Sequence, residues 1–458
     1  MRAVTNMTEG SAWRHLARFA LPVLLGNLLQ QCYNVVDTII VGRTLGVSAL
    51  AAVGATGNIV FFFFSLISGV TMGVSIIISQ FYGARDIRML RRTFGTSIFA
   101  MLAVTAVVTG LGLLFRRPLL RLLNTPEDIL EMADRYIVII IGGLCTTVLY
   151  NWISSILRAM GNSLTPLLFL AVSAVLNIFF NYFFILVLHM GVEGAAWGTI
   201  AAQLLSGGSC LLYAMRVTPE LRVRRSEIGW DWPIVRNILK YGIPAGLQSS
   251  FISISIMAMQ SVVNTYGSTV TAAYSVAVKV ENFSMLAGNS IGMGLGTFVG
   301  QNVGAGKPER VRYGFRVAVL MVLCVCAVLS PLLFFCSEGI TALFVDSGEN
   351  VEAANMIAIG ARYVRTFSFF LICVGVLNLL QHLLRSSGDV GMSMVMGGWE
   401  IVTRVAISFT LSSLLGMNGV WWATPITWTT TMTWGLVRYF SGKWQNHCVK
   451  IQSREADA

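Results

Sequence analysis

Residues 164–188 read LTPLLFLAVSAVLNIFFNYFFILVL, an uncharged apolar run long enough to cross a lipid bilayer as a helix. The stretches 98–115 and 137–157 are also free of charged residues. Over the 458 residues of the chain, 55% are hydrophobic and 12% are charged. Soluble domains carry about 25% charged residues, so this composition would leave too little polar surface in water. The sequence therefore predicts an all-α integral membrane protein.

The apolar runs between charged breaks predict about twelve transmembrane helices. They cover 17–42, 51–80, 93–115, 134–157, 165–188, 193–215, 241–264, 270–299, 316–336, 356–384, 393–415 and 419–440. With an even number of spans both termini lie on one side, and most of the 32 Lys and Arg residues then fall on that side. The positive-inside rule places that side in the cytoplasm. We therefore expect a multi-pass protein of the inner, cytoplasmic membrane with both termini cytoplasmic.

The chain contains an internal duplication. LPVLLGNLLQQ from Leu21 resembles IPAGLQSSFIS from Ile243, and SQFYGAR from Ser79 resembles GQNVGAG from Gly300. Further matches join GVSALAA at 46–52 to GSTVTAA at 267–273, LRAMG at 157–161 to LRSSG at 384–388, and GVEGAAW at 191–197 to GMNGVWW at 416–422. All five matches occur in the same order at nearly one offset. They predict two pseudo-symmetric six-helix bundles, related by an axis along the membrane normal because six spans are an even number.

This duplication sets the expected domain boundaries. We predict an N-terminal six-helix lobe at 1–216, a charged cytoplasmic linker at 217–240, a C-terminal six-helix lobe at 241–440 and a cytoplasmic tail at 441–458. Two such bundles are a common build for a transporter that binds its substrate between the halves and exposes it alternately to each side.

Several other classes of function have no support in the sequence. The eight cysteines include no Cys-x-x-Cys pair and the four histidines are scattered, so neither a metal site nor a cofactor is expected. Gly304–Lys307 reads GAGK without the Ser or Thr that ends a phosphate loop, which argues against nucleotide binding. The excess of basic residues shows no interleaved aromatics, so nucleic acid is not an expected partner. We expect a protein that is not an enzyme.

Two segments resemble the multidrug and toxic compound extrusion (MATE) family. They are LPVLLGNLLQQCYNVVDTIIVGRTLGVSALAAVG from Leu21 and KVENFSMLAGNSIGMGLGTFVGQNVGAGKPERV from Lys279. The resemblance extends over about residues 15–440 and implies a MATE-like fold of two six-helix lobes around a central cleft. It also implies export of organic cations in exchange for H⁺ or Na⁺, with amphipathic drugs and the lipid bilayer as partners. We expect a monomer.

The resemblance is to the DinF-like branch of that family, because Gln248 stands where another branch has an acid and the middle of 356–384 has none. In the DinF-like branch a cation or proton site lies in the first lobe. The matching residues here are Asp37, Tyr136, Ser154, Asn177, Asn181 and Thr199. Asn181 departs from the pattern, since many relatives have Asp there.

Asp37 is the central candidate for coupling, because a charged group at the bilayer centre costs about 2.5–3.5 kcal/mol and therefore needs a partner, a proton or a function. A satisfied structural acid is the alternative. Asn177 and Asn181 are four residues apart on one helical face, which suits either a cation shell or an interhelical hydrogen-bonded pair. Thr199 fits a site or ordinary helix packing.

The candidates for lining a substrate cleft are Glu281, Gln248 and Met257. Glu281 could contact a cationic substrate, or it could pair with Lys279 or with a neighbouring helix. Glu400 and Arg404 have the i, i+4 spacing and order of an intrahelical ion pair.

We therefore predict a secondary antiporter that works by alternating access. The alternative is a lipid or oligosaccharide flippase, for which the acidic Asp37 is a poor fit to a pyrophosphate headgroup. H⁺ is favoured over Na⁺ as the coupling ion because Asn181 removes the second carboxylate that would hold Na⁺, and its amide offers two N–H donors beside one oxygen.

Overall fold

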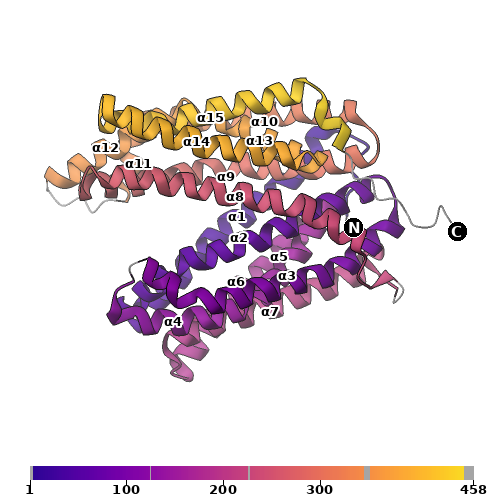
Figure 1. Cartoon of the computed structure of the whole chain (residues 1–458), viewed down its shortest axis with the longest axis horizontal. Helices are drawn as coiled ribbons and strands as arrows, with labels where there is room; N and C mark the ends of the chain where they lie inside the picture. The colour runs from indigo at the N-terminus through magenta and orange to yellow at the C-terminus, as the bar shows by residue number, and fades with distance from the viewer. Residues whose placement is uncertain (1–3, 124, 225–226, 345–350, 448–458) are drawn as a thin grey trace.

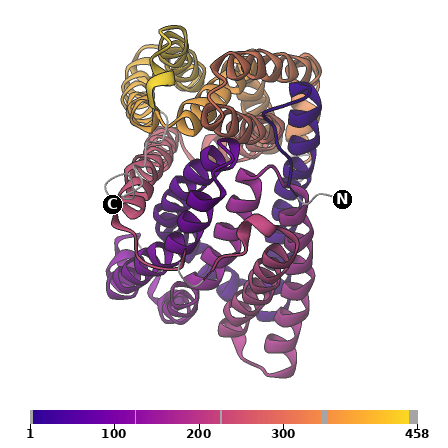
Figure 2. The same cartoon turned by 90° about the vertical axis from the view of Figure 1, so that its right-hand side faces the viewer.

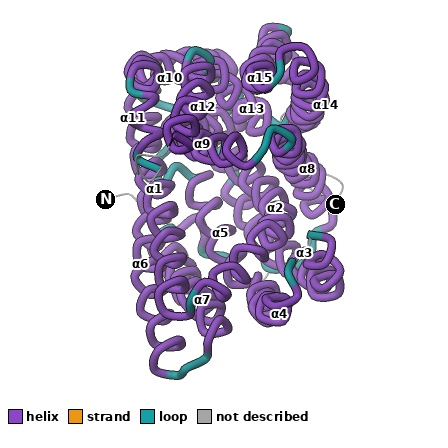
Figure 3. Tube along the Cα trace, turned by 90° about the vertical axis from the view of Figure 1, so that its left-hand side faces the viewer, coloured by secondary structure: helices purple, strands orange, loops and turns teal. Residues whose placement is uncertain are grey.

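The computed structural model describes residues 4–123, 125–224, 227–344 and 351–447, and this part of the chain contains helices and no β-strand. Figure 1 shows two layers of long helices, with the first half of the chain in one layer and the second half in the other. Figures 2 and 3 show the same division from the two ends of the molecule. The all-α fold predicted from composition is confirmed.

The described part of the first lobe and the start of the linker contain helices α1 to α7 and the short turns η1 and η2. They are α1 (Ala12–Leu45), α2 (Val47–Gly83), α3 (Ile87–Leu122), α4 (Glu127–Gly142), α5 (Leu144–Ala159), α6 (Leu164–Tyr182) with a π-helical turn η1 (Phe183–Val187), α7 (Gly191–Val217) and η2 (Pro219–Leu221).

The second lobe has the same plan. It contains α8 (Trp232–Asn264), α9 (Ser268–Gly304), α10 (Pro308–Phe335), the short α11 (Ser337–Ala342), α12 (Val351–Ser368), α13 (Leu371–Ser387), α14 (Val390–Leu415), α15 (Met417–Phe440) and a 3₁₀ turn η4 (Lys443–His447). Helix α8 starts nine residues before the span predicted at 241–264 and takes up the end of the predicted linker.

The turns of the two lobes match residue for residue. Gly46 and Gly267 have φ of 85° and 95°, Gly161 and Gly388 have 83° and 97°, and Gly191 and Gly416 have 63° and 61°. The left-handed region is open to glycine at no steric cost. A fourth equivalent pair, Arg85 and Gly306, has φ of 60° and 68° although only one member is glycine. The internal matches in the sequence therefore mark equivalent backbone turns.

Two predicted spans are broken helices. The span predicted at 134–157 is α4 followed by α5, bent by 44° around Gly143, and the span predicted at 356–384 is α12 followed by α13, bent by 57°. Each was expected to be one helix. The two breaks fall on the fourth spans of their lobes, so the bend is part of the duplicated plan.

Length and composition identify seven of the described helices as able to cross a membrane, or nine spans when each bent pair counts as one. Three further helices occupy the remaining predicted spans: α1, α9 and α15, with 34, 37 and 24 residues. These three are not among the helices that length and composition identify as membrane spans. Asp37 lies in α1, Glu281 lies in α9, and α15 contains TWTTTMTW. Each of the twelve predicted spans thus corresponds to a helix or a bent pair.

The first helix of each lobe packs on the other lobe. Helix α1 contacts α9 and α10, while α8 contacts α2 and α3. Figure 3 shows α1 and α8 at opposite edges of the boundary between the lobes. The layers converge at the end where α1 begins and α15 ends, and they diverge toward the other end (Figure 1). We call the converging end the inner end, after the predicted orientation.

Equivalent residues close the inner end reciprocally. Gln80 Nε2 in α2 donates to the Ser386 carbonyl of α13 at 3.0 Å, and Gln301 Nε2 in α9 donates to the Ala159 carbonyl of α5 at 3.1 Å. Gln80 matches Gln301 in the duplication, and Ala159 matches Ser386. Each lobe therefore gives the same bond to the other.

Glycines allow this approach. A Cβ on Gly83 would collide with the Gln301 carbonyl, and a Cβ on Gly304 would collide with the Gln80 carbonyl. The N-terminal segment also joins the lobes, because the Thr5 amide donates to the Met160 carbonyl and the Met7 amide donates to Gln301 Oε1 at 2.8 Å.

We predict that Gly83→Ala destabilises the protein by about 1–3 kcal/mol, the usual cost of overpacking a tight contact. The added methyl group would have to displace the backbone of α9. Thermal unfolding of the purified protein, followed by tryptophan fluorescence, measures the effect. Gly57→Ala in the same helix is the control, because open space surrounds Gly57. Equal unfolding temperatures for the two variants would contradict the close approach.

Candidate functional site

The acid predicted to couple transport is held by a neighbouring helix. Asp37 lies in α1 and is half-buried, and its Oδ1 accepts a hydrogen bond of 2.6 Å from Asn181 Nδ2 in α6. No Lys, Arg or His is within ion-pair distance of Asp37 in the described chain. Its negative charge is therefore offset by amide dipoles, without a cationic partner.

A chain of hydrogen bonds continues from Asp37 through α6 into α7. Asn181 Nδ2 also donates to Asn177 Oδ1 at 3.1 Å, and Asn177 Nδ2 donates to Thr199 Oγ1 at 3.3 Å. Thr199 Oγ1 in turn donates to the Ala195 carbonyl at 3.2 Å. We call Asp37, Asn177, Asn181 and Thr199 the Asp37 group.

Helix packing makes room for Asn181. A Cβ on Gly198 would overlap Asn181 Oδ1, so the side chain of Asn181 fills the space that a larger residue at 198 would take. Asn177 and Asn181 are 1% and 0% exposed. Asn181 Oδ1 is buried without a hydrogen-bond partner in the described chain, and such an atom is a ready acceptor for a proton donor or a cation.

Tyr136 lies beside the Asp37 group. It is buried in the first lobe in a small apolar cluster with Ile40 and Val41 of α1, one helical turn after Asp37. Tyr33 of α1, which the sequence did not single out, interacts electrostatically with Asp37, and its buried hydroxyl has no hydrogen-bond partner among the described residues. Its position four residues before Asp37, on the same helical face, was the available signal.

Ser154 is not joined to this group. It lies in α5, fully buried, and its hydroxyl has no hydrogen-bond partner in the part of the chain that the structure describes. Its neighbours Ser155 and Arg158 line a cavity at the inner end of the lobe interface. The structure thus brings together four of the six predicted coupling residues by hydrogen bonds, with Tyr136 in contact with α1.

Glu281 belongs to a second polar group, in the other lobe. Tyr363 in α12 donates a hydrogen bond of 2.6 Å to Glu281 Oε2 and lies 3.4 Å from Thr424 Oγ1 in α15. Arg404 in α14 donates to the same Thr424 Oγ1 at 3.0 Å. Glu281 therefore pairs with a neighbouring helix, one of the two alternatives left open, and its neighbour Lys279 is exposed without an ion pair to it.

The predicted Glu400–Arg404 ion pair is present in α14. Arg404 Nη2 lies 3.4 Å from Glu400 Oε1, and each side chain is 5% exposed. Tyr363 also packs on Tyr274 and Trp421, with ring centroids 5.6 and 5.1 Å away. This aromatic packing holds the second polar group inside its lobe.

The other two cleft candidates differ in accessibility. Gln248 is 1% exposed and accepts a hydrogen bond of 2.6 Å from Ser393 in α14, so in this state it packs within the second lobe and meets no cleft. Met257, nine residues further along α8, is 61% exposed. The prediction that Gln248 lines a cleft does not describe this state, since α14 covers the side chain.

The Asp37 group contains one carboxylate, which is held by the amide of Asn181. The N–H of Asn181 points at the carboxylate, so the amide donates where a cation ligand would have to present oxygen. No cluster of three or more His, Cys, Asp or Glu that could hold a metal occurs among the described residues.

Comparison with known proteins agrees with this architecture. The family model described as MatE matches residues 22–183 and 244–410, one segment in each lobe. The chain is 29% identical over 443 residues to the probable multidrug resistance protein YpnP of Bacillus subtilis, covering 96% of this chain and 97% of that protein.

Solved structures share the fold. The crystal structure of a MATE protein in the bent conformation superposes with a TM-score of 0.88 at 20% identity, covering 97% of this chain and 99% of that one. An outward-facing multidrug resistance MATE transporter gives 0.85 at 22% identity, covering 95% and 98%.

We predict that Gly198→Ala disrupts the Asp37 group, because the added methyl group would occupy the position of Asn181 Oδ1. The thermal unfolding temperature should fall, since a buried hydrogen bond of this kind contributes about 1–3 kcal/mol. Gly208→Ala, in the same helix and with nothing within 4 Å, is the matched control and should leave the temperature unchanged. A stable Gly198→Ala protein would show that the two side chains do not compete for this space.

Proposed function

Since this chain belongs to the MATE family of multidrug efflux transporters, we propose that it is a secondary active antiporter exporting organic compounds in exchange for H⁺. The Asp37 group carries this proposal. Its acid lies inside a lobe of a membrane protein, is held by the Asn181 amide and has no cationic partner among the described residues. Intramembrane acids of this kind mark ion and proton pathways.

The coupling step follows from the hydrogen bonds. Asp37 as a carboxylate accepts from Asn181; once protonated, it no longer attracts that N–H with a full charge. The contact between α1 and α6 is then weaker. Helix α1 contains Pro22, which removes a backbone hydrogen bond and allows bending.

A bend in α1 would act directly on the other lobe, because α1 packs on α9 and α10. Protonation of Asp37 would thus change how α1 packs on the second lobe and would favour a different position of the two lobes relative to each other. Alternating access then requires only that the contacts at the inner end open while the diverging ends of the two lobes move toward each other.

The substrates we propose are cationic and amphipathic. Exposed apolar side chains such as Met257 and Phe283 occur on the halves of α8 and α9 nearest the diverging ends of the lobes. Flexible, polarizable methionine tolerates ligands of different shapes. In a bilayer the protein would be oriented with both termini in the cytoplasm, where the basic loops lie.

We predict that Asp37→Asn reduces coupled efflux to the background of cells lacking the transporter, while expression and the thermal unfolding temperature remain near wild type. Asparagine keeps the size of the aspartate side chain and one accepting oxygen, but its amide does not bind a proton at physiological pH. Efflux of a fluorescent cationic dye from energised cells measures the loss.

Glu281→Gln is the matched control for that experiment, because it removes the acid of the other lobe. Its coupled efflux should persist at a reduced or unchanged rate. Loss of coupling in Glu281→Gln together with normal coupling in Asp37→Asn would move the site to the second lobe.

We predict that transport continues in potassium-only medium and follows the pH gradient. Proteoliposomes with a dye substrate and an internal pH indicator measure both fluxes together. Asn181→Asp, which restores a second carboxylate beside Asp37, should create a stimulation by Na⁺ that the wild type lacks. Activity that vanishes without Na⁺ and returns at millimolar Na⁺ would overturn H⁺ coupling while leaving antiport intact.

A further inference from the structure

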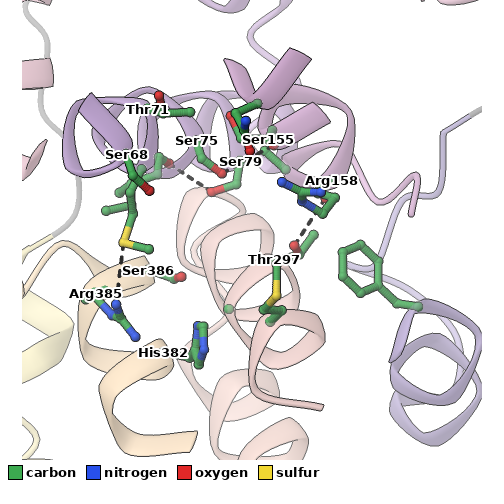
Figure 4. A pocket seen from close by; sticks show the side chains of 17 residues that line it. Ser68, Thr71, Ser75, Ser79, Ser155, Arg158, Thr297, His382, Arg385 and Ser386 are labelled. Carbon is green, nitrogen blue, oxygen red and sulfur yellow. Dashed lines mark hydrogen bonds between the residues drawn. The ribbon is translucent and has the colours of Figure 1, made fainter. Parts of the chain in front are cut away.

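A cavity of about 200 Å³ lies between the two lobes, beside the reciprocal contacts of the inner end. Figure 4 shows its lining, which comes from α1, α2 and α5 of the first lobe and from α9 and α13 of the second. Neither the Asp37 group nor the Glu281 group borders it. It is therefore a separate site.

Two arginines at equivalent positions of the duplication face this cavity. Arg158 comes from LRAMG in α5 and Arg385 comes from LRSSG in α13. Figure 4 shows the two guanidinium groups on different sides of the cavity, with His382 near Arg385. One cation thus comes from each lobe.

The two positive charges are not neutralised by protein. The cavity lining contains no Asp or Glu, and neither arginine has an acidic partner within 4 Å in the described chain. Arg385 donates only to the Gln381 carbonyl at 3.2 Å and to Met72 Sδ at 3.7 Å, and the Arg158 guanidinium makes no hydrogen bond among the described residues. Most N–H donors of both groups are therefore free.

Neutral donors surround these charges. The hydroxyl groups of Ser68 and Ser386 line the cavity and make no hydrogen bond within the described part of the chain. Arginine forks and hydroxyl groups are the donors that bind phosphate-type oxyanions in proteins. Two cations that line one cavity without an anion also repel each other, and the repulsion is stronger where water is scarce.

We propose that this cavity binds an oxyanion of the phosphate type, held between Arg158 of the first lobe and Arg385 of the second. The volume supports a small group, because pockets for drug-sized ligands span about 300–1,000 Å³. A free inorganic phosphate and the phosphate of a lipid headgroup share this chemistry.

Binding would stabilise the closed inner end. The anion can contact both lobes only while α5 and α13 line the same cavity. Its binding therefore favours the state described here over a state in which the inner end is open. The proposed oxyanion is thus a ligand distinct from the exported compound and the coupling ion.

The test uses the full-length protein in maltoside detergent, stripped of bound lipid. Inorganic phosphate is titrated against chloride at constant ionic strength while the thermal unfolding temperature is followed by tryptophan fluorescence. We expect a saturable rise for wild type. Arg158→Gln and Arg385→Gln should each weaken the apparent affinity about tenfold or more, the usual effect of losing a charge-assisted contact.

Arg121→Gln is the matched control, since Arg121 is exposed in the last turn of α3 and contacts no anion site; its titration should equal wild type. If a glutamine variant does not fold, Arg158→Lys and Arg385→Lys keep the charge without the planar fork, and we expect binding at reduced affinity. A short-chain phosphatidic acid that raises the temperature at lower concentration than phosphate, with the same dependence on both arginines, identifies a lipid phosphate as the source.

Two results would overturn the proposal: no saturable rise for wild type beyond chloride, or a rise of equal affinity in the variants at both arginines. Neither readout depends on transport. A failure of this site is therefore distinguishable from a failure of the proposed antiport.

Discussion

The structure depends on the reciprocal contact that closes the inner end. Gln80 and Gln301 each donate to a carbonyl of the opposite lobe, at equivalent positions of the duplicated chain. The contact needs Gly83 and Gly304, since a side chain at either would strike the opposing backbone. Hydrogen bonds between amide and carbonyl contribute only about 0.5–1.5 kcal/mol each. A closure made of a few such bonds is specific in position and is weak enough to open during a transport cycle.

The duplication repeats the scaffold but not the chemistry. Both lobes have a broken fourth span and the same turn glycines, whereas the polar groups within them differ. The first lobe holds Asp37 among amides and without a cation, while the second holds Glu281 near Arg404 and a set of aromatic rings. A carboxylate held only by an amide can change its protonation at lower cost than one set in a network with a buried arginine. This difference, rather than the fold, assigns the coupling to the first lobe in our proposal.

Periodicity and the internal repeat predicted most of the fold. The turns of GVSALAA and GSTVTAA, for example, occur at Gly46 and Gly267 with nearly the same φ. The bends between α4 and α5 and between α12 and α13 were not predictable, because an apolar run is equally long whether it is straight or broken. Within one helix, residue spacing correctly indicated side-chain pairs: Asn177 with Asn181, and Glu400 with Arg404. Spacing could not indicate the partnership of Glu281 with Tyr363, because it joins α9 to α12. Arg158 and Arg385 lie directly after the spans predicted at 134–157 and 356–384 and share an LR motif, but the motif did not indicate that both line one cavity.

The most direct test of the account is the distance between the lobes. In a cysteine-free protein, one pair of spin labels at Arg216 and Glu309 reports the inner end, and another pair at Val47 and Leu343 reports the diverging end; all four positions are exposed. Double electron–electron resonance measures the distance within each pair of spin labels, in the parent protein and in the double variant Gln80→Ala/Gln301→Ala. The account predicts that the variant lengthens the inner distance and shortens the other. An unchanged inner distance would contradict the claim that these reciprocal bonds hold the lobes closed.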